Sequence, residues 1–90
     1  MTVLWQKIAQ SEAISDVLLE RDRQDIKWGE QNRQPLEWVS IIGEEYGEVC
    51  KETIELYEQR SVSNKAYYKE LVHLAATVLA AIEDYRRHEP

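Results

Sequence analysis

Two sets of side chains, spaced as on helix faces, are the residues of this chain best suited to chemistry. Glu44, Glu45 and Glu48 lie in one segment, and Glu70 and His73 follow in a second. At roughly 100° per residue, the three glutamates share one side of a helix. Mg²⁺ prefers oxygen ligands and usually bridges a few carboxylates to the phosphates of a substrate. The spacing therefore indicates a candidate site for a divalent cation.

The same glutamates also have a simpler interpretation. Glu52 and Glu55 extend the acidic arc along the helix, and apolar side chains occupy the opposite arc, which is the pattern of any amphipathic surface helix. Residues 36–60 hold seven glutamates against Lys51 and Arg60. Such a segment suits cations, or substrates that carry them, and the spacing alone leaves both interpretations open.

Length, charge and cysteine content limit the classes of protein to which the chain can belong. Its 90 residues predict one domain, residues 1–90, with a limited core that oligomerisation would extend. A net charge of −6 argues against a nucleic-acid module, which needs a basic footprint. The lone Cys50 and the absence of a signal-like N-terminus predict a cytoplasmic protein. No apolar run approaches the roughly 18 residues of a membrane span, so we expect no membrane partner.

Apolar periodicity predicts helices and no strands. Gly29 and Pro35 bound a loop over residues 28–35, Pro35 suits the first position of a helix, and Asn64 suits an N-cap. Ser11 is a candidate break in the first helix. The helices are expected over about residues 3–27, 35–60 and 65–87, with residues 61–64 as a short polar connection.

The third segment is apolar on almost every side. Residues 71–82 carry no formal charge, which indicates a buried helix that packs between its own chain and another subunit. A narrow polar stripe interrupts it, formed by Glu70, His73, Thr77 and Asp84. Buried polar groups need partners, and a cation would let this stripe face the acidic helix. The predicted fold class is therefore all-α, a helical bundle completed by homo-oligomerisation.

The two motifs resemble the signature of a known family. Glu44-Glu45-x-x-Glu48 and, after 21 residues, Glu70-x-x-His73 are similar to the Glu-Glu-x-x-Glu and Glu-x-x-Asp motifs of the MazG-like, all-α nucleoside triphosphate pyrophosphohydrolases. Residues 20–24 and 27–31, with Trp38, look like the smaller phage and bacterial members. The resemblance spans about residues 20–84.

The resemblance implies a homodimer or homotetramer that cleaves the α–β phosphoanhydride of a nucleoside triphosphate, giving a monophosphate and pyrophosphate. It implies that Mg²⁺ or Mn²⁺ is the cofactor, and that the cation neutralises phosphate charge and lowers the pKa of a bound water. The implied cation ligands are Glu45, Glu48, Glu70 and His73. Glu44 would be the catalytic base or a further ligand.

The remaining candidates are residues that would contact the substrate. Trp28 and Trp38 would stack on a base, although large apolar side chains are more often core or interface anchors. Lys51 would offset phosphate charge, or is simply solvated. His73 stands where the family has Asp, which favours Mn²⁺ and other transition metals, unless this histidine is a hydrogen-bonded core residue. The alternative function is a non-catalytic helical oligomeric or interaction module of the same fold.

Overall fold

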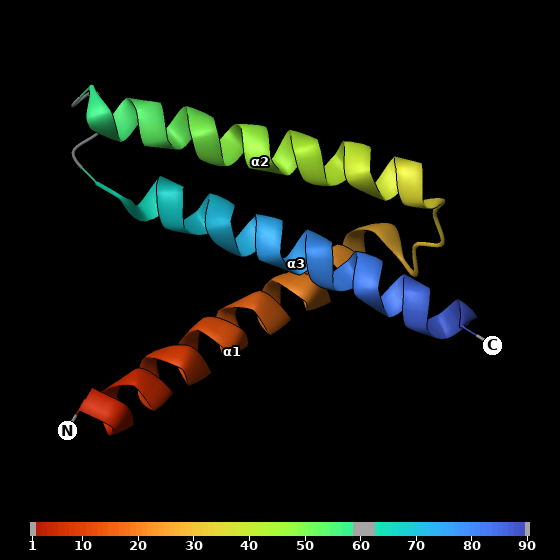
Figure 1. The fold of residues 1–90 in the computed structure, drawn as a ribbon, viewed down its shortest axis with the longest axis horizontal. Helices are drawn as coiled ribbons and strands as arrows, with labels where there is room; N and C mark the ends of the chain where they lie inside the picture. The colour runs from red at the N-terminus through yellow and green to blue at the C-terminus, as the bar shows by residue number, and fades with distance from the viewer. Residues whose placement is uncertain (1, 59–62, 90) are drawn as a thin grey trace.

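The fold consists of three helices. The structure, a computed structural model, describes residues 2–58 and 63–89. These form α1 (Thr2–Trp28), α2 (Pro35–Tyr57) and α3 (Lys65–His88), with no strand in the described ranges. The all-α prediction is therefore confirmed. The second and third helices lie side by side as an antiparallel hairpin, and α1 crosses α3 obliquely (Figure 1).

The loop between α1 and α2 forms for the local reasons that the sequence indicates. Gly29 adopts a φ of 72°, which a glycine tolerates after the last turn of a helix. Its N–H donates to the carbonyl of Asp25 over 2.8 Å. Pro35 is the first residue of α2, and the preceding N–H of Gln34 donates to Glu37 Oε1 over 2.9 Å. Both helix ends are thus closed by local bonds.

Three details differ from the predicted helices. The first helix runs through Ser11 without a break, because Ser is tolerated in a helix interior. The second helix ends at Tyr57, and residues 59–62, which include part of the predicted connection, lie outside the described residues. Asn64 is the N-cap of α3, but its near-helical backbone keeps its side chain from capping. Ser63 Oγ accepts the Lys65 N–H instead, at 3.2 Å.

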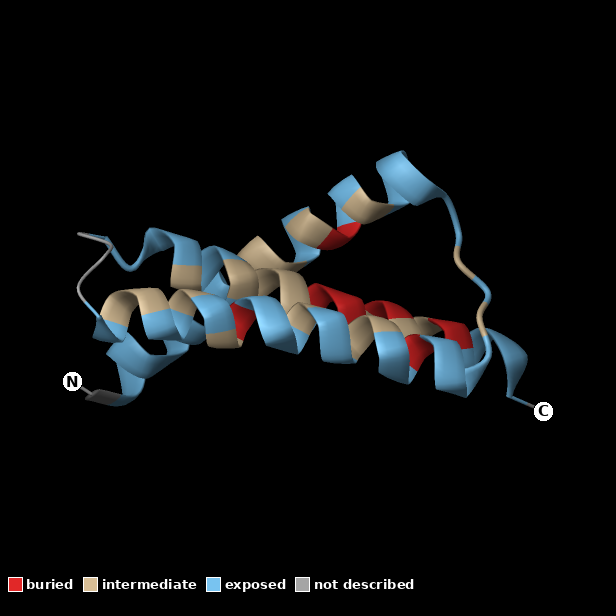
Figure 2. Cartoon of the chain, turned by 90° about the horizontal axis from the view of Figure 1, so that it is seen from above, coloured by how far each residue is buried: buried red, intermediate tan, exposed pale blue. Residues whose placement is uncertain are grey.

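The third helix is the centre of the molecule. Within the described ranges, the backbone of α3 approaches both α2 and α1, whereas α1 and α2 do not approach each other. Small buried side chains, Ala76 and Ala80, allow this close approach, and Trp38 and Val49 complete the buried apolar set from α2 (Figure 2). The hydroxyl of Tyr68 also donates to Asp16, which ties the start of α3 to α1.

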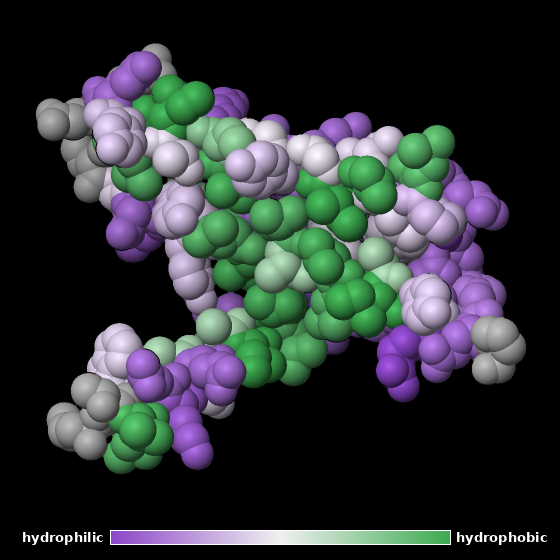
Figure 3. Space-filling model, in the orientation of Figure 1, coloured by the Kyte–Doolittle hydropathy of each residue, from purple (hydrophilic) through white to green (hydrophobic). Residues whose placement is uncertain are grey.

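Much of the apolar surface of the single chain remains exposed. No large side chain of the described residues is completely buried, and Ile26 and Tyr57 are 87% and 88% exposed. Figure 3 shows apolar side chains gathered on one broad face of the molecule. On α3 the exposed large apolar and aromatic residues are Tyr68, Leu71, Val78, Ile82 and Tyr85. None of the helices in the described part of the chain is long and apolar enough to cross a membrane.

Candidate metal centre and adjoining cavity

Three of the predicted ligands lie together between α2 and α3. Glu45, Glu70 and His73 each offer one ligand atom, and these atoms lie within 4.8 Å of one another. Glu70 and His73 are three residues apart on α3, so they occupy neighbouring positions of one helix face, and Glu45 faces them from α2. All three side chains are half-buried. This grouping could hold a metal ion.

A fourth residue of the site comes from α1 and was not predicted. His73 lies between two carboxylates, with Nδ1 3.5 Å from Glu70 Oε2 and Nε2 3.6 Å from Glu20 Oε1. Glu20 Oε1 also accepts a hydrogen bond of 2.7 Å from Arg23. We refer to Glu20, Glu45, Glu70 and His73 as the carboxylate–histidine cluster. It draws on all three helices.

The environment of Glu45 disfavours a bare negative charge. Burial raises the pKa of the Glu45 carboxyl above its ordinary value, while the neighbouring His73 lowers it. The negative charges of Glu70, Glu48 and Glu20 also raise the pKa. A bound cation would relieve this repulsion, and so would protonation of a cluster member.

The other charged candidates lie outside the group of three. Glu44, Glu48 and Lys51 are exposed on α2, and among them only Glu48 affects the pKa of Glu45. Their predicted roles as base, ligand and phosphate contact remain predictions.

A small cavity adjoins the cluster at Glu45. Its volume is about 180 Å³, and both Trp28 and Trp38 line it. Ile41 and Ala80 add apolar surface. The remaining lining residues are polar, namely Gln24, Gln31, Arg33, Glu45 and Thr77. The two tryptophans that the sequence singles out thus share one cavity with a candidate ligand.

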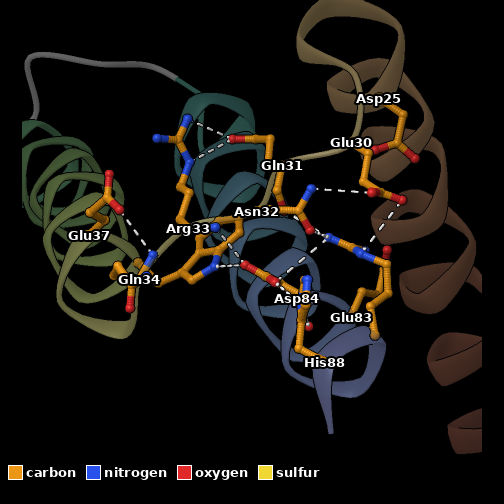
Figure 4. A network of polar contacts seen from close by, with 12 residues as sticks. Asp25, Glu30, Gln31, Asn32, Arg33, Gln34, Glu37, Glu83, Asp84 and His88 are labelled. Carbon is orange, nitrogen blue, oxygen red and sulfur yellow. Dashed lines mark hydrogen bonds and ion pairs between the residues drawn. The ribbon is translucent and has the colours of Figure 1, made fainter.

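The two tryptophans differ in their surroundings. Trp38 is 6% exposed, and its indole N–H donates a hydrogen bond to Asp84 (Figure 4). Because the backbone N–H of Arg33 and the Trp38 indole both bond to it, the pKa of Asp84 is lowered. Trp28 is 61% exposed, with Lys27 Nζ 4.7 Å from its ring centre. Trp38 is therefore a core anchor that also lines the cavity, while Trp28 is accessible at its rim.

The donor atoms of Glu45, Glu70 and His73 fit a divalent cation chemically. Two carboxylates and one imidazole form a mixed oxygen and nitrogen set. Carboxylates suit Mg²⁺ and Mn²⁺, whereas imidazole suits transition metals. The set therefore favours Mn²⁺ over a purely oxygen-binding ion.

Sequence reasoning did not assign Glu20 or Gln24 to the site, because a spacing of four residues puts them on one helix face but does not say what that face packs against. They lie four residues apart on α1, as do Ile41 and Glu45 on α2, and His73 and Thr77 on α3. A spacing of four corresponds to about one helical turn of 5.4 Å. Gln24, Ile41 and Thr77 all line the cavity, so its lining extends about one turn beyond the cluster on each helix.

Comparisons with known proteins identify no relative of the chain. No protein-family model matches the chain, and no curated protein or solved structure matches it significantly. The resemblance to MazG-like enzymes therefore stays a prediction that rests on the motifs.

Proposed function

We propose that the protein is a metal-dependent nucleotide pyrophosphohydrolase. It would cleave the α–β phosphoanhydride of a nucleoside triphosphate and release a monophosphate and pyrophosphate. The observation that carries this proposal is the grouping of Glu45, Glu70 and His73 beside a cavity lined by two tryptophans. A nucleotide has charged phosphates and a flat base. Ligands for a cation next to a cavity lined by aromatic rings would suit both parts.

Each residue then has a defined task. Glu45, Glu70 and His73 would hold a divalent cation, Mg²⁺ or Mn²⁺. When bound, the cation would neutralise phosphate charge and lower the pKa of a bound water. Glu44, next in sequence to Glu45, would take the proton of the attacking water. Trp28 would stack on the base at the open rim of the cavity.

We also propose that the active form is a homodimer or homotetramer in the cytoplasm. The exposed apolar side chains of α3 support an oligomer, since a face this apolar is unusual on a monomer. A second chain that covers Leu71, Val78 and Ile82 would complete the bundle around α3.

The test is release of pyrophosphate from nucleoside triphosphates with Mg²⁺ or Mn²⁺ present. Glu45→Gln should abolish release, because it removes a ligand charge. The matched control is Asp22→Asn, which neutralises an exposed carboxylate on α1 and should leave turnover unchanged. Unchanged turnover in Glu45→Gln would exclude this site.

A non-catalytic helical module is the second candidate. The position of His73 between Glu20 and Glu70 favours it, because a protonated imidazole would compensate the cluster without a cation. The two candidates differ in thermal unfolding. A true metal site gains about 2.7 kcal/mol at a cation concentration of about 100 Kd, whereas the module gains nothing.

A further inference from the structure

The cavity beside Glu45 has a polar side whose hydrogen-bonding character is fixed by its neighbours. Gln24 and Gln31 both line it. A free glutamine side chain offers a ligand either an acceptor or two donors, because its amide can turn over. In this cavity both amide oxygens accept from an arginine, which can only donate, so the orientation of each amide is set.

Arg21 holds the oxygen of Gln24. Its guanidinium is buried, and it is clamped by Glu83 through Nε at 3.0 Å and Nη2 at 2.6 Å. Nη2 also lies 3.0 Å from Asp25 Oδ1. The remaining Nη1 donates to Gln24 Oε1 over 3.1 Å. Two carboxylates thus fix the arginine, and the arginine fixes the glutamine.

The NH₂ group of Gln24 therefore points the other way. Its nitrogen lies 3.5 Å from Thr77 Oγ1, a long contact. The Thr77 hydroxyl donates to the carbonyl of His73 over 2.9 Å, so toward Gln24 it can only accept. Both neighbours of the Gln24 amide impose the same orientation. The group left for a ligand is an N–H donor.

Gln31 is arranged in the same way. Its Oε1 accepts from Arg33 Nε at 3.0 Å and from Arg33 Nη2 at 2.9 Å (Figure 4). Its NH₂ is again the group available to a ligand. Gln24, Gln31 and the Arg33 guanidinium thus each present a donor to the cavity.

The size of the cavity limits what it can take. At about 180 Å³ it is smaller than the roughly 300–1,000 Å³ of pockets that enclose a drug-sized ligand. It suits one flat ring system rather than a whole nucleotide. Glu45 both lines the cavity and belongs to the cluster, which leaves the phosphates within reach of the candidate cation ligands.

We propose that Gln24 determines base specificity, so that the cavity selects bases with a carbonyl oxygen over those with an amino group at the same ring position. The inference rests on the proposed function, since it assumes that a nucleotide is the ligand. If a base placed an amino group against the Gln24 NH₂, two hydrogen-bond donors would face each other and neither would have an acceptor. A mismatch of this kind lowers affinity by about tenfold to a hundredfold.

Equilibrium binding tests the proposal without requiring hydrolysis. Titration calorimetry would compare UMP with CMP, and IMP with AMP, in the presence of Mn²⁺. The native protein should bind UMP and IMP at least about tenfold more tightly than their partners. Gln24→Met, which removes the donor, should abolish the preference, and Gln24→Glu, which presents only acceptors, should reverse it. Gln10→Glu, an exposed position on the same helix, is the charge control and should leave the preference unchanged.

Pyrophosphate release from dUTP, dCTP, dITP and dATP separates this inference from the proposed function. Equal binding within each pair, or a preference that survives both Gln24 variants, would overturn the role of Gln24 even if release is observed. Selective binding without release would overturn the proposed reaction and support base selection by Gln24. Absence of binding of all four monophosphates together with absence of release from all four triphosphates would overturn both.

Discussion

The indole N–H of Trp38 donates a 2.7 Å hydrogen bond to Asp84 Oδ2, and this bond joins α2 to α3 where both are buried. The same oxygen accepts the backbone N–H of Arg33 over 2.8 Å, and His88 Nδ1 lies 2.9 Å from the other carboxylate oxygen. Asp84 thus fastens the loop before α2 and the body of α2 to the C-terminal end of α3. The open end of the hairpin, where α2 begins and α3 ends, and the wall of the cavity that Trp38 forms both depend on it.

Trp38→Phe should destabilise the protein through loss of this bond rather than loss of volume. Phenylalanine keeps most of the apolar contact but leaves one bond of a buried carboxylate unmade. We expect the Tm to fall by about 5 °C. Circular dichroism melts would measure it. Tyr85→Phe, which removes a polar group from an exposed ring, is the control and should leave the Tm unchanged.

Acid should destabilise the protein through Asp84 and Glu83. Hydrogen bonds from Arg33 and Trp38 lower the pKa of Asp84, and the bond from Arg21 lowers the pKa of Glu83. A carboxyl with a lowered pKa stabilises the fold above its unfolded-state pKa, and this contribution is lost as pH falls through the folded-state value. The free energy of unfolding should therefore decrease below about pH 4.

Denaturant titrations at several pH values would test this acid sensitivity. Glu83→Gln should be less stable at pH 7 and should lose less stability on acidification than the native chain. Glu89→Gln, at an exposed position, should follow the native pH profile. A native profile that is flat from pH 7 to about pH 3 would contradict the role of both carboxylates.

Mn²⁺ should bind at least as tightly as Mg²⁺, because His73 contributes an imidazole nitrogen to the ligand set. His73→Asp should shift the preference towards Mg²⁺ by about tenfold, since an all-oxygen set suits the harder ion. Calorimetric titration with each cation would measure both constants. A clear preference of the native protein for Mg²⁺ would mean that His73 does not contact the ion.

The apolar face of α3 should be an interface between copies of the chain. Val78→Lys combined with Ile82→Lys places two charges on this face, and it should convert an oligomer into a monomer. Lys69→Glu, an exposed change on the opposite side of the same helix, should not alter the mass. Sedimentation equilibrium at micromolar concentration would show either outcome, and a monomeric native protein would refute the prediction.

The sequence predicted the helices well because their signals are local. Pro35, Gly29 and the apolar periodicity act within one or two turns, so the helix ends near residues 28, 35 and 65 follow from neighbours in the chain. Glu45, Glu70 and His73 could be grouped in advance, since two of them share one helix face. Glu20 and the orientation of the Gln24 amide could not be predicted. They depend on how α1 crosses α3 and on the clamp between Arg21 and Glu83, which joins residues 62 positions apart.

The repeated spacing of four residues on all three helices constrains how this chain can change in length. One residue inserted between Glu20 and Gln24, or between His73 and Thr77, would rotate everything beyond it by about 100°. Cavity and cluster would then face different directions, although every side chain needed for each would still be present. Insertions and deletions should therefore be excluded from these three helical turns. A library of single-residue insertions would test this. The gain in stability on adding a cation should be lost for insertions in these three helical turns.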